Sequence, residues 1–313
     1  ELRKKHNLCD WASLLMLKEI ADQLCGTDTN EAVLMMGYLY CQSGYKVRFA
    51  SDNADHLYLL VASDYFMYGK LSYEIDGDIY YPVQEAKPVL HICKAKFPNE
   101  SKLSLGITKA MQLDNTEAES RVIKSKAYPD MKIDVAVNRS LIDFYNTYPS
   151  AYTNNDKMTY FRVYADTPMS EDVKKQTYPA LRSCLQGLSE HQAVSRLLNF
   201  VQTGFEYEYD ETIWGCDRAF FAEETLYYPY CDCEDRSILL SRLIRDLLGL
   251  DCVLIYYPGH LACAVNFTQK EKGDYYMYNQ KEYTVCDPTY INAPIGVQMP
   301  NFKDKEATVV PIK

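Results

Sequence analysis

The two ends of the chain share one plan, in which a helix is followed by a meander of strands. The stretch "NEAVLMMGYLYCQSGYKVRFA", which begins at Asn30, aligns with "DRSILLSRLIRDLLGLDCVLI", which begins at Asp235, with the apolar positions in step. One inserted residue then brings His56 onto His260, and "DGDIYYPVQ" onto "NQKEYTVCD". Self-similarity of this kind indicates a repeated supersecondary unit. The sequence therefore predicts two related α+β units at the ends of the chain.

The residues between these units have a different pattern. From Pro88 to Asp166, strand-like runs such as "VLHICKAKF", "LSLGITKAM", "KIDVAVN" and "TYFRVYAD" follow one another with almost no helical period, which favours a β-sandwich. Helical spacing returns in "SEDVKKQTYPALRSCLQGL" and "EHQAVSRLLNFVQTGF". We therefore expect an α+β protein of three domains: the first repeat at 1–85, a β-sandwich at 86–168, and a domain with the second repeat at 169–313.

Composition excludes several classes of function. The net charge of −10 comes from acids spread over all 313 residues, so the basic stripe that a phosphate backbone requires is missing and nucleic acid is not expected as a partner. No apolar run is long enough for a membrane span, because Arg242, Arg245 and Asp246 interrupt the best candidate. The first residue, Glu1, predicts an excised fragment whose preceding segment is missing.

One cysteine stands where its thiolate could be stabilised. Cys233 falls at the start of an amphipathic helix, where free backbone N–H groups and the helix dipole favour a negative charge. Acids on both sides, Asp232 and Glu234, oppose a thiolate, so activation needs an added cation such as a protonated histidine. Cys231 lies two residues earlier, in the irregular stretch before the helix. It is either a packed thiol or a reversible disulfide partner that blocks Cys233, and packing is the simpler interpretation.

A histidine and an aspartate complete a possible catalytic set. His260 begins a predicted strand after a Pro-Gly turn, and Asp287 ends another predicted strand. If the two strands pair, the carboxylate can accept the second imidazole N–H and fix the tautomer. Each residue alone is more often structural than catalytic. In the first repeat, however, Asp28 replaces the cysteine and Gln84 replaces the aspartate, so that copy cannot perform the same chemistry.

Three blocks of the second repeat, "DCEDRSILLSRLIRDLLGL", "YYPGHLACAV" and "YTVCDPTY", resemble the catalytic blocks of the transglutaminase-like superfamily, within the papain-like fold. The Asp-Cys-Glu-Asp stretch is similar to that of the bacterial transglutaminase-like cysteine proteinases. The resemblance covers roughly 189–300 and implies that Cys233 is the nucleophile, His260 the general base and acid, and Asp287 its orienting carboxylate. It also implies that residues 1–85 are a degenerate transglutaminase-like repeat.

The resemblance further implies a thiol enzyme that hydrolyses peptide or side-chain amide bonds of a protein or peptide, with cell-wall peptides among the candidates and transamidation left open. One oxyanion donor would be the backbone N–H of Cys233, and the second a side chain of Gln202, Tyr207 or Trp214. A bacterial envelope or periplasmic location fits. No cofactor or metal is expected, because no nucleotide fingerprint or second Cys/His pair at zinc spacing is present. The alternative is a non-catalytic module that binds a peptide or glycan.

Overall fold

The protein consists of two compact units. The computed structural model describes residues 1–97, 100–114, 116, 119–153 and 156–313. One unit contains Glu1–Gly106 and Tyr148–Tyr160, and the other contains Ile107–Thr147 and Phe161–Lys313. Both units mix helices with strands, so the α+β class expected from the sequence is confirmed. Within the described residues, no helix has the length and apolar character to cross a membrane.

The first unit has helices on one antiparallel sheet. Its helices are α1 (Leu2–Lys5), α2 (Asp10–Cys25) and α3 (Asn30–Gln42), and its sheet has the order β4-β5-β2-β1-β6. The five strands are β4 (Tyr73–Ile75), β5 (Asp78–Pro82), β2 (Leu57–Ser63), β1 (Val47–Ser51) and β6 (His91–Ile92). A separate pair joins β3 (Tyr65–Met67) and β9 (Ala151–Thr153). Val33, Met36 and Tyr40 of α3 are buried in the core between the helices and the strands.

The second unit also packs a helix against a five-stranded antiparallel sheet, and further helices surround this arrangement. Helix α10 (Cys233–Leu248) packs against a sheet of order β14-β15-β13-β12-β16. The strands are β14 (Tyr275–Tyr278), β15 (Lys281–Cys286), β13 (His260–Val265), β12 (Cys252–Tyr257) and β16 (Thr308–Pro311). The remaining elements are α4 (Arg139–Tyr145), α5 (Thr159–Asp166), α6 (Glu171–Leu185), α7 (Glu190–Gly204), α8 (Asp210–Ile213), α9 (Ala222–Tyr227), the parallel pair β10 (Glu206–Tyr207) and β11 (Tyr230–Cys231), the pair β7 (Arg121–Lys124) and β8 (Lys132–Val135), and a 3₁₀ turn (Pro300–Phe302).

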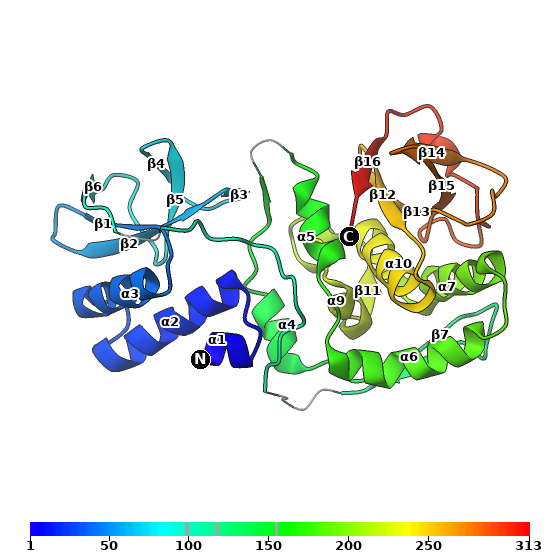
Figure 1. Ribbon diagram of the computed structural model, residues 1–313, viewed down its shortest axis with the longest axis horizontal. Coiled ribbons are helices and arrows are strands. Elements are labelled where there is room, and N and C mark those ends of the chain that lie inside the picture. Colours follow the sequence, from blue (N-terminus) through cyan, green and yellow to red (C-terminus); the bar gives the residue numbers. More distant parts are fainter. Residues whose placement is uncertain (98–99, 115, 117–118, 154–155) are drawn as a thin grey trace. The chain divides into compact units, whose positions relative to one another are not determined.

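The two sheets share one topology, which supports the repeat seen in the sequence. In each unit a helix leads into an antiparallel hairpin, β1–β2 or β12–β13. The next hairpin joins the sheet through its second strand, β5 or β15, and a later strand, β6 or β16, pairs with the first strand of the sheet. The β4–β5 and β14–β15 hairpins both turn on two residues of positive φ, Asp76-Gly77 and Asn279-Gln280, the signature of a type I′ turn. Figure 1 shows each sheet beside its own helix, in blue and cyan for the first unit and in yellow to red for the second.

The expected β-sandwich of residues 86–168 is wrong. The described part of this region contains helices α4 and α5 and only short strands, and none of these strands builds a second facing sheet. The run "TYFRVYAD" is helix α5 rather than a strand, because eight residues rich in aromatic and β-branched side chains fit either period and the packing decides. The region is also divided between the two units. Whether 85/86 and 168/169 delimit independently folding domains stays a prediction.

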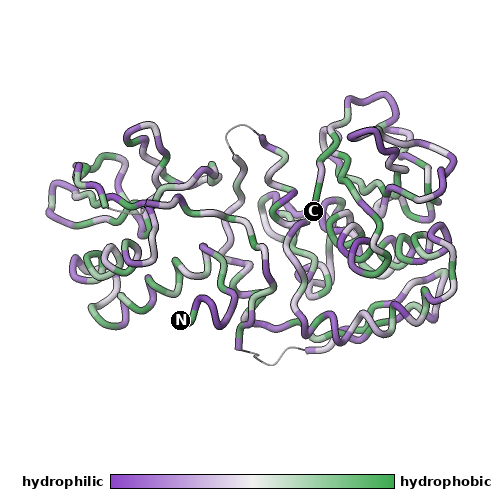
Figure 2. Tube along the Cα trace, viewed as in Figure 1, coloured by the Kyte–Doolittle hydropathy of each residue, from purple (hydrophilic) through white to green (hydrophobic). Residues whose placement is uncertain are grey.

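Helix α10 is the buried centre of the second unit. Its side chains from Glu234 to Ile244 are all buried, including the polar Arg236 and Ser237. The helix ends at Gly249, which has the left-handed conformation that favours glycine. Figure 2 shows that hydrophobic (green) and hydrophilic (purple) residues alternate along α6 and α7 of this unit, as they do in amphipathic helices. A rigid, buried α10 fixes the position of the residue that begins it, Cys233.

Candidate active site

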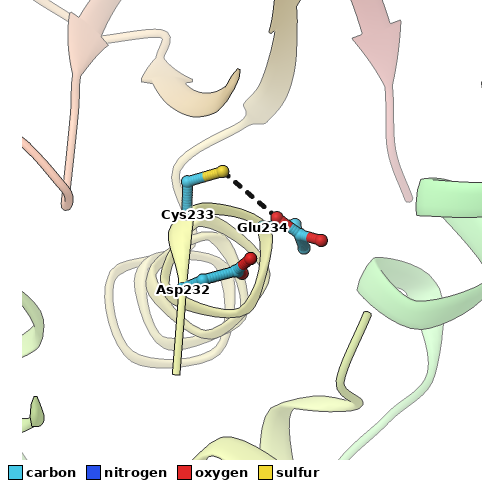
Figure 3. A group of neighbouring side chains, drawn as sticks. All are labelled: Asp232, Cys233 and Glu234. Carbon is cyan, nitrogen blue, oxygen red and sulfur yellow. Dashed lines mark hydrogen bonds between the residues drawn. The ribbon is translucent and has the colours of Figure 1, made fainter. Parts of the chain in front are cut away.

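Cys233 is the first residue of α10. Strand β11 delivers the chain to the helix, and Asp232 is the N-cap residue between them. The Cys233 side chain is half-buried and extends from the end of the helix toward Glu234 (Figure 3). Its thiol donates to Oε2 of Glu234 over 3.1 Å. The backbone N–H of Leu261 lowers the pKa of the same thiol, and α10 packs against β13, so Cys233 lies near the beginning of β13.

His260 and Asp287 form the buried pair that the sequence predicted. Nε2 of His260 lies 2.8 Å from Oδ2 of Asp287, and the two side chains are 5% and 2% exposed. The pair forms because β13 and β15 are antiparallel neighbours and Asp287 directly follows β15. The other carboxylate oxygen accepts the backbone N–H groups of Thr289 and Tyr290, so Asp287 cannot rotate freely.

Two aromatic rings, whose centroids are themselves 5.3 Å apart, pack against the imidazole of His260. The Phe302 ring is stacked on one side with centroids 4.7 Å apart, and the Tyr257 ring is nearly parallel at 6.0 Å. Because Nε2 faces Asp287, Nδ1 is the nitrogen left for a reacting group. Among the described residues no hydrogen bond joins Cys233 to His260. The link between them is the Leu261 N–H, one residue beyond the histidine.

The thiol of Cys233 is neutral in this arrangement. Burial raises its pKa well above the usual value, and the charges of Glu234 and Asp232 raise it further. The helix N-terminus and the Leu261 N–H act in the opposite direction but do not compensate. This outcome agrees with the expectation that the flanking acids oppose a thiolate, so attack by the sulfur requires a base that removes its proton.

The three candidate oxyanion side chains have different partners in the structure. Gln202 uses its Nε2 atom on the carbonyl oxygens of Asp287, Tyr290 and Ala293, so it positions the aspartate loop instead. Trp214 packs in an aromatic cluster with Phe220 and Tyr228. Tyr207 is 37% exposed, and after burial the charge of Cys233 is the next cause that raises the pKa of its phenol. Tyr207 is therefore the one candidate of the three that the electrostatics connect to Cys233.

Cys231 is a packed thiol. It is 2% exposed, burial raises its pKa to about 12, and its sulfur accepts a hydrogen bond from Nε of Arg236 over 3.4 Å. The same guanidinium donates to the carbonyls of Gln202 and Phe205. Cys231 thus anchors the segment before the nucleophile, as the simpler of the two sequence interpretations proposed.

An acidic cluster beside Cys233 was not recognised from the sequence. It consists of five side chains from the segment before α10 and from its first turn, namely Asp210, Asp217, Asp232, Glu234 and Asp235. Burial raises the pKa of four of them, to about 6 for Asp210. The carboxylate oxygens of Asp210, Asp217 and Glu234 lie within 4.8 Å of one another, as do those of Asp210, Asp232 and Asp235. Hard cations prefer such oxygen ligands, so these are the described residues that could hold one.

The equivalent positions of the first unit have no such arrangement. His56 lies next to Asp52, with Nδ1 3.2 Å from Oδ2, rather than next to the residue that replaces the orienting aspartate. That residue, Gln84, accepts the backbone N–H of Leu59 and donates to the carbonyl of Leu57. Asp28 precedes α3 by two residues instead of starting the helix. The first unit therefore keeps the sheet and lacks the chemical groups.

No family model matches the chain, and no curated protein matches it.

Proposed function

We propose that the second unit is a thiol acyl-transfer enzyme with Cys233 as nucleophile, of the transglutaminase-like type within the papain-like fold. The observation that carries the proposal is the buried His260–Asp287 pair at 2.8 Å, placed at the beginning of the strand whose Leu261 N–H lowers the pKa of the Cys233 thiol. Burying a histidine against a carboxylate costs solvation free energy, and a catalytic imidazole explains why the fold keeps it.

The reaction would proceed in two halves. Nδ1 of His260 takes the thiol proton while the sulfur attacks an amide carbonyl, and the new S–C bond leaves an oxyanion. The N–H of Cys233 and the phenol of Tyr207 stabilise the oxyanion. The imidazolium then protonates the leaving amine as the C–N bond breaks. Water attacks the thioester, its proton passes to His260, and the thiol is restored with release of a carboxylic acid. An amine in place of water gives a new amide.

The experiment uses the whole chain with an unfolded protein such as reduced, alkylated casein, with and without a fluorescent primary amine. Cleavage and amine incorporation are followed on gels, and the thioester is sought by intact-mass measurement after acid quenching. We expect a loss of at least about 10³-fold in turnover for Cys233→Ala. Cys184→Ala, which removes a half-buried thiol elsewhere in the same unit, serves as the matched control.

Two outcomes would reject the enzyme. Turnover that persists in Cys233→Ala would show that another group performs the chemistry. Saturable binding of a peptide or glycan that is equal in wild type and Cys233→Ser, with no turnover in either, would favour the non-catalytic binding module. Tyr207→Phe tests the oxyanion assignment separately, because loss of one donor costs about 10²–10³-fold in kcat.

A further inference from the structure

The acidic cluster brings five carboxyl groups together, and burial raises the pKa of four of them, so each of these four loses its proton only at a higher pH than usual. No Lys or Arg side chain of the described chain forms an ion pair with any of its five carboxyl groups. The guanidinium of Arg218, whose charge lowers the pKa of Asp210, is bound to Glu224 and lies over the ring of Trp214. The backbone N–H of Arg218 donates to one oxygen of Asp210, and the backbone N–H groups of Phe220 and Asp232 donate to the two oxygens of Asp235. The other carboxylate oxygens of the cluster can still accept hydrogen bonds, which is unusual for a site this buried.

One oxygen of the cluster is buried without a hydrogen bond to the described chain, although its carboxyl group lies against that of Glu234. Asp232 is 8% exposed, and its Oδ1 atom is buried without a hydrogen bond. A buried carboxylate oxygen of this kind is costly unless a donor arrives from outside the protein. Asp217 is exposed and lies within 4.8 Å of Asp210 and Glu234, so the cluster is continuous with the surface. A positively charged group can therefore approach Asp232 by way of Asp217.

Exposed apolar side chains flank the cluster on the segments that lead to the nucleophile. Tyr207, Tyr209 and Ile213 are 37%, 62% and 41% exposed, and Tyr230 on the neighbouring strand β11 is 36% exposed. Tyr207 and Tyr209 stand edge to face, with ring centroids 5.4 Å apart. Amphipathic rings at the surface beside a reactive thiol suit the apolar side chains of an extended polypeptide.

We propose that the acidic cluster receives a basic side chain, arginine or lysine, of a polypeptide substrate whose neighbouring apolar residues lie on Tyr207, Tyr209, Ile213 and Tyr230. This inference rests on the proposed function, because it places the basic residue beside the amide that Cys233 attacks. The charges are complementary, and the cation supplies the N–H donors that Asp232 Oδ1 lacks. A negatively charged or uncharged polar side chain would leave the carboxylates uncompensated, so the cluster also excludes other residues.

The test measures binding separately from turnover. Fluorescein-labelled octapeptides of Ala, Leu and Phe carry one arginine that is moved from position to position, and a second set carries citrulline, which has the same shape without the charge. Binding to full-length Cys233→Ala protein is followed by fluorescence anisotropy at low and at 0.5 M salt. At one or more positions we expect the arginine peptide to bind at least tenfold more tightly than its citrulline partner, with the difference reduced by salt.

Asp217→Asn, combined with Cys233→Ala, is the informative variant, because an exposed residue can be changed without disturbing the core. We expect it to bring the arginine and citrulline affinities within about threefold of each other. Asp172→Asn, which changes an exposed acid on α6, should keep the full difference. Equal binding of both sets at every position, or a difference that survives Asp217→Asn, would overturn the inference.

A metal ion is the competing occupant. If CaCl₂ alone raises the melting temperature of the wild type but not of Asp217→Asn, and arginine peptides neither bind nor compete with Ca²⁺, the cluster is a metal site and the inference is wrong. Arginine-dependent binding without turnover by the wild type would reject the enzyme and leave the ligand assignment standing. Turnover without preference for arginine would support the enzyme and reject the assignment of a basic ligand.

Discussion

Nε2 of His260 lies 2.8 Å from Oδ2 of Asp287, and Oδ1 of the same carboxylate accepts the Thr289 N–H over 2.9 Å. The aspartate therefore fixes both the tautomer and the orientation of the imidazole. Asp287→Asn keeps an oxygen for the Thr289 N–H and loses the charge that stabilises the imidazolium. We expect kcat to fall by about 10³–10⁴-fold with little change in KM or melting temperature. A kcat within threefold of wild type would show that the pair is structural.

Gln202 should act on the reaction through the position of Asp287. Its buried Nε2 group donates to three carbonyl oxygens of the loop after β15. Gln202→Leu removes this donor, although the Tyr290 carbonyl keeps the Ala293 N–H. The loss should cost about 1–3 kcal/mol in free energy of unfolding and lower kcat more than it changes KM. Urea unfolding and steady-state kinetics measure the two effects. Gln192→Leu, at the exposed N-terminus of α7, is the control for the loss of an amide. A stability loss with unchanged kcat would limit Gln202 to a structural role.

Glu234 should hold the nucleophile in its neutral form. Its carboxylate accepts a hydrogen bond of 3.1 Å from the Cys233 thiol, and its charge raises the pKa of that thiol. Glu234→Gln removes the charge, so the pKa of Cys233 should fall and the alkylation of Cys233 should begin at lower pH. Labelling rates by mass spectrometry between pH 5 and 10 give both curves. A midpoint that stays in place or moves to higher pH would contradict the electrostatic explanation.

Asp210 should make the second unit less stable as the pH rises. Burial raises its pKa from 3.8 to about 6, so the folded chain binds this proton more tightly than the unfolded chain does. The resulting stabilisation is complete below about pH 4 and is lost as the pH rises through 6. Asp210→Asn lacks this dependence. From pH 4 to pH 7.5 its free energy of unfolding should therefore rise by about 2 kcal/mol relative to that of the wild type. Denaturant titrations at the two pH values measure the change, and a constant difference would refute it.

The sequence predicted the sheets and the His–Asp pair because these depend on local periodicity and on antiparallel neighbours. The β14–β15 hairpin joins the sheet through its second strand, which brings the start of β13 close to the end of β15. It failed at α5, where "TYFRVYAD" fits either period and tertiary packing selects the helix. It also missed the acidic cluster. The Asp-Cys-Glu-Asp stretch was visible, but Asp210 and Asp217 reach it only through the fold. The role of Gln202 likewise depends on a loop distant in sequence.

The alkylation rate of Cys233 with and without His260 tests the central claim most directly. Wild type and His260→Ala are treated with iodoacetamide at pH 7.5, and every cysteine is quantified by peptide mass spectrometry. Because the thiol is neutral at rest, its reactivity depends on proton removal by the imidazole. We predict that Cys233 labels at least tenfold more slowly in His260→Ala, while Cys184 labels at the same rate in both proteins and the fully buried Cys286 stays unlabelled as evidence of an intact fold. Equal labelling of Cys233 in the two proteins would contradict the thiol–imidazole mechanism.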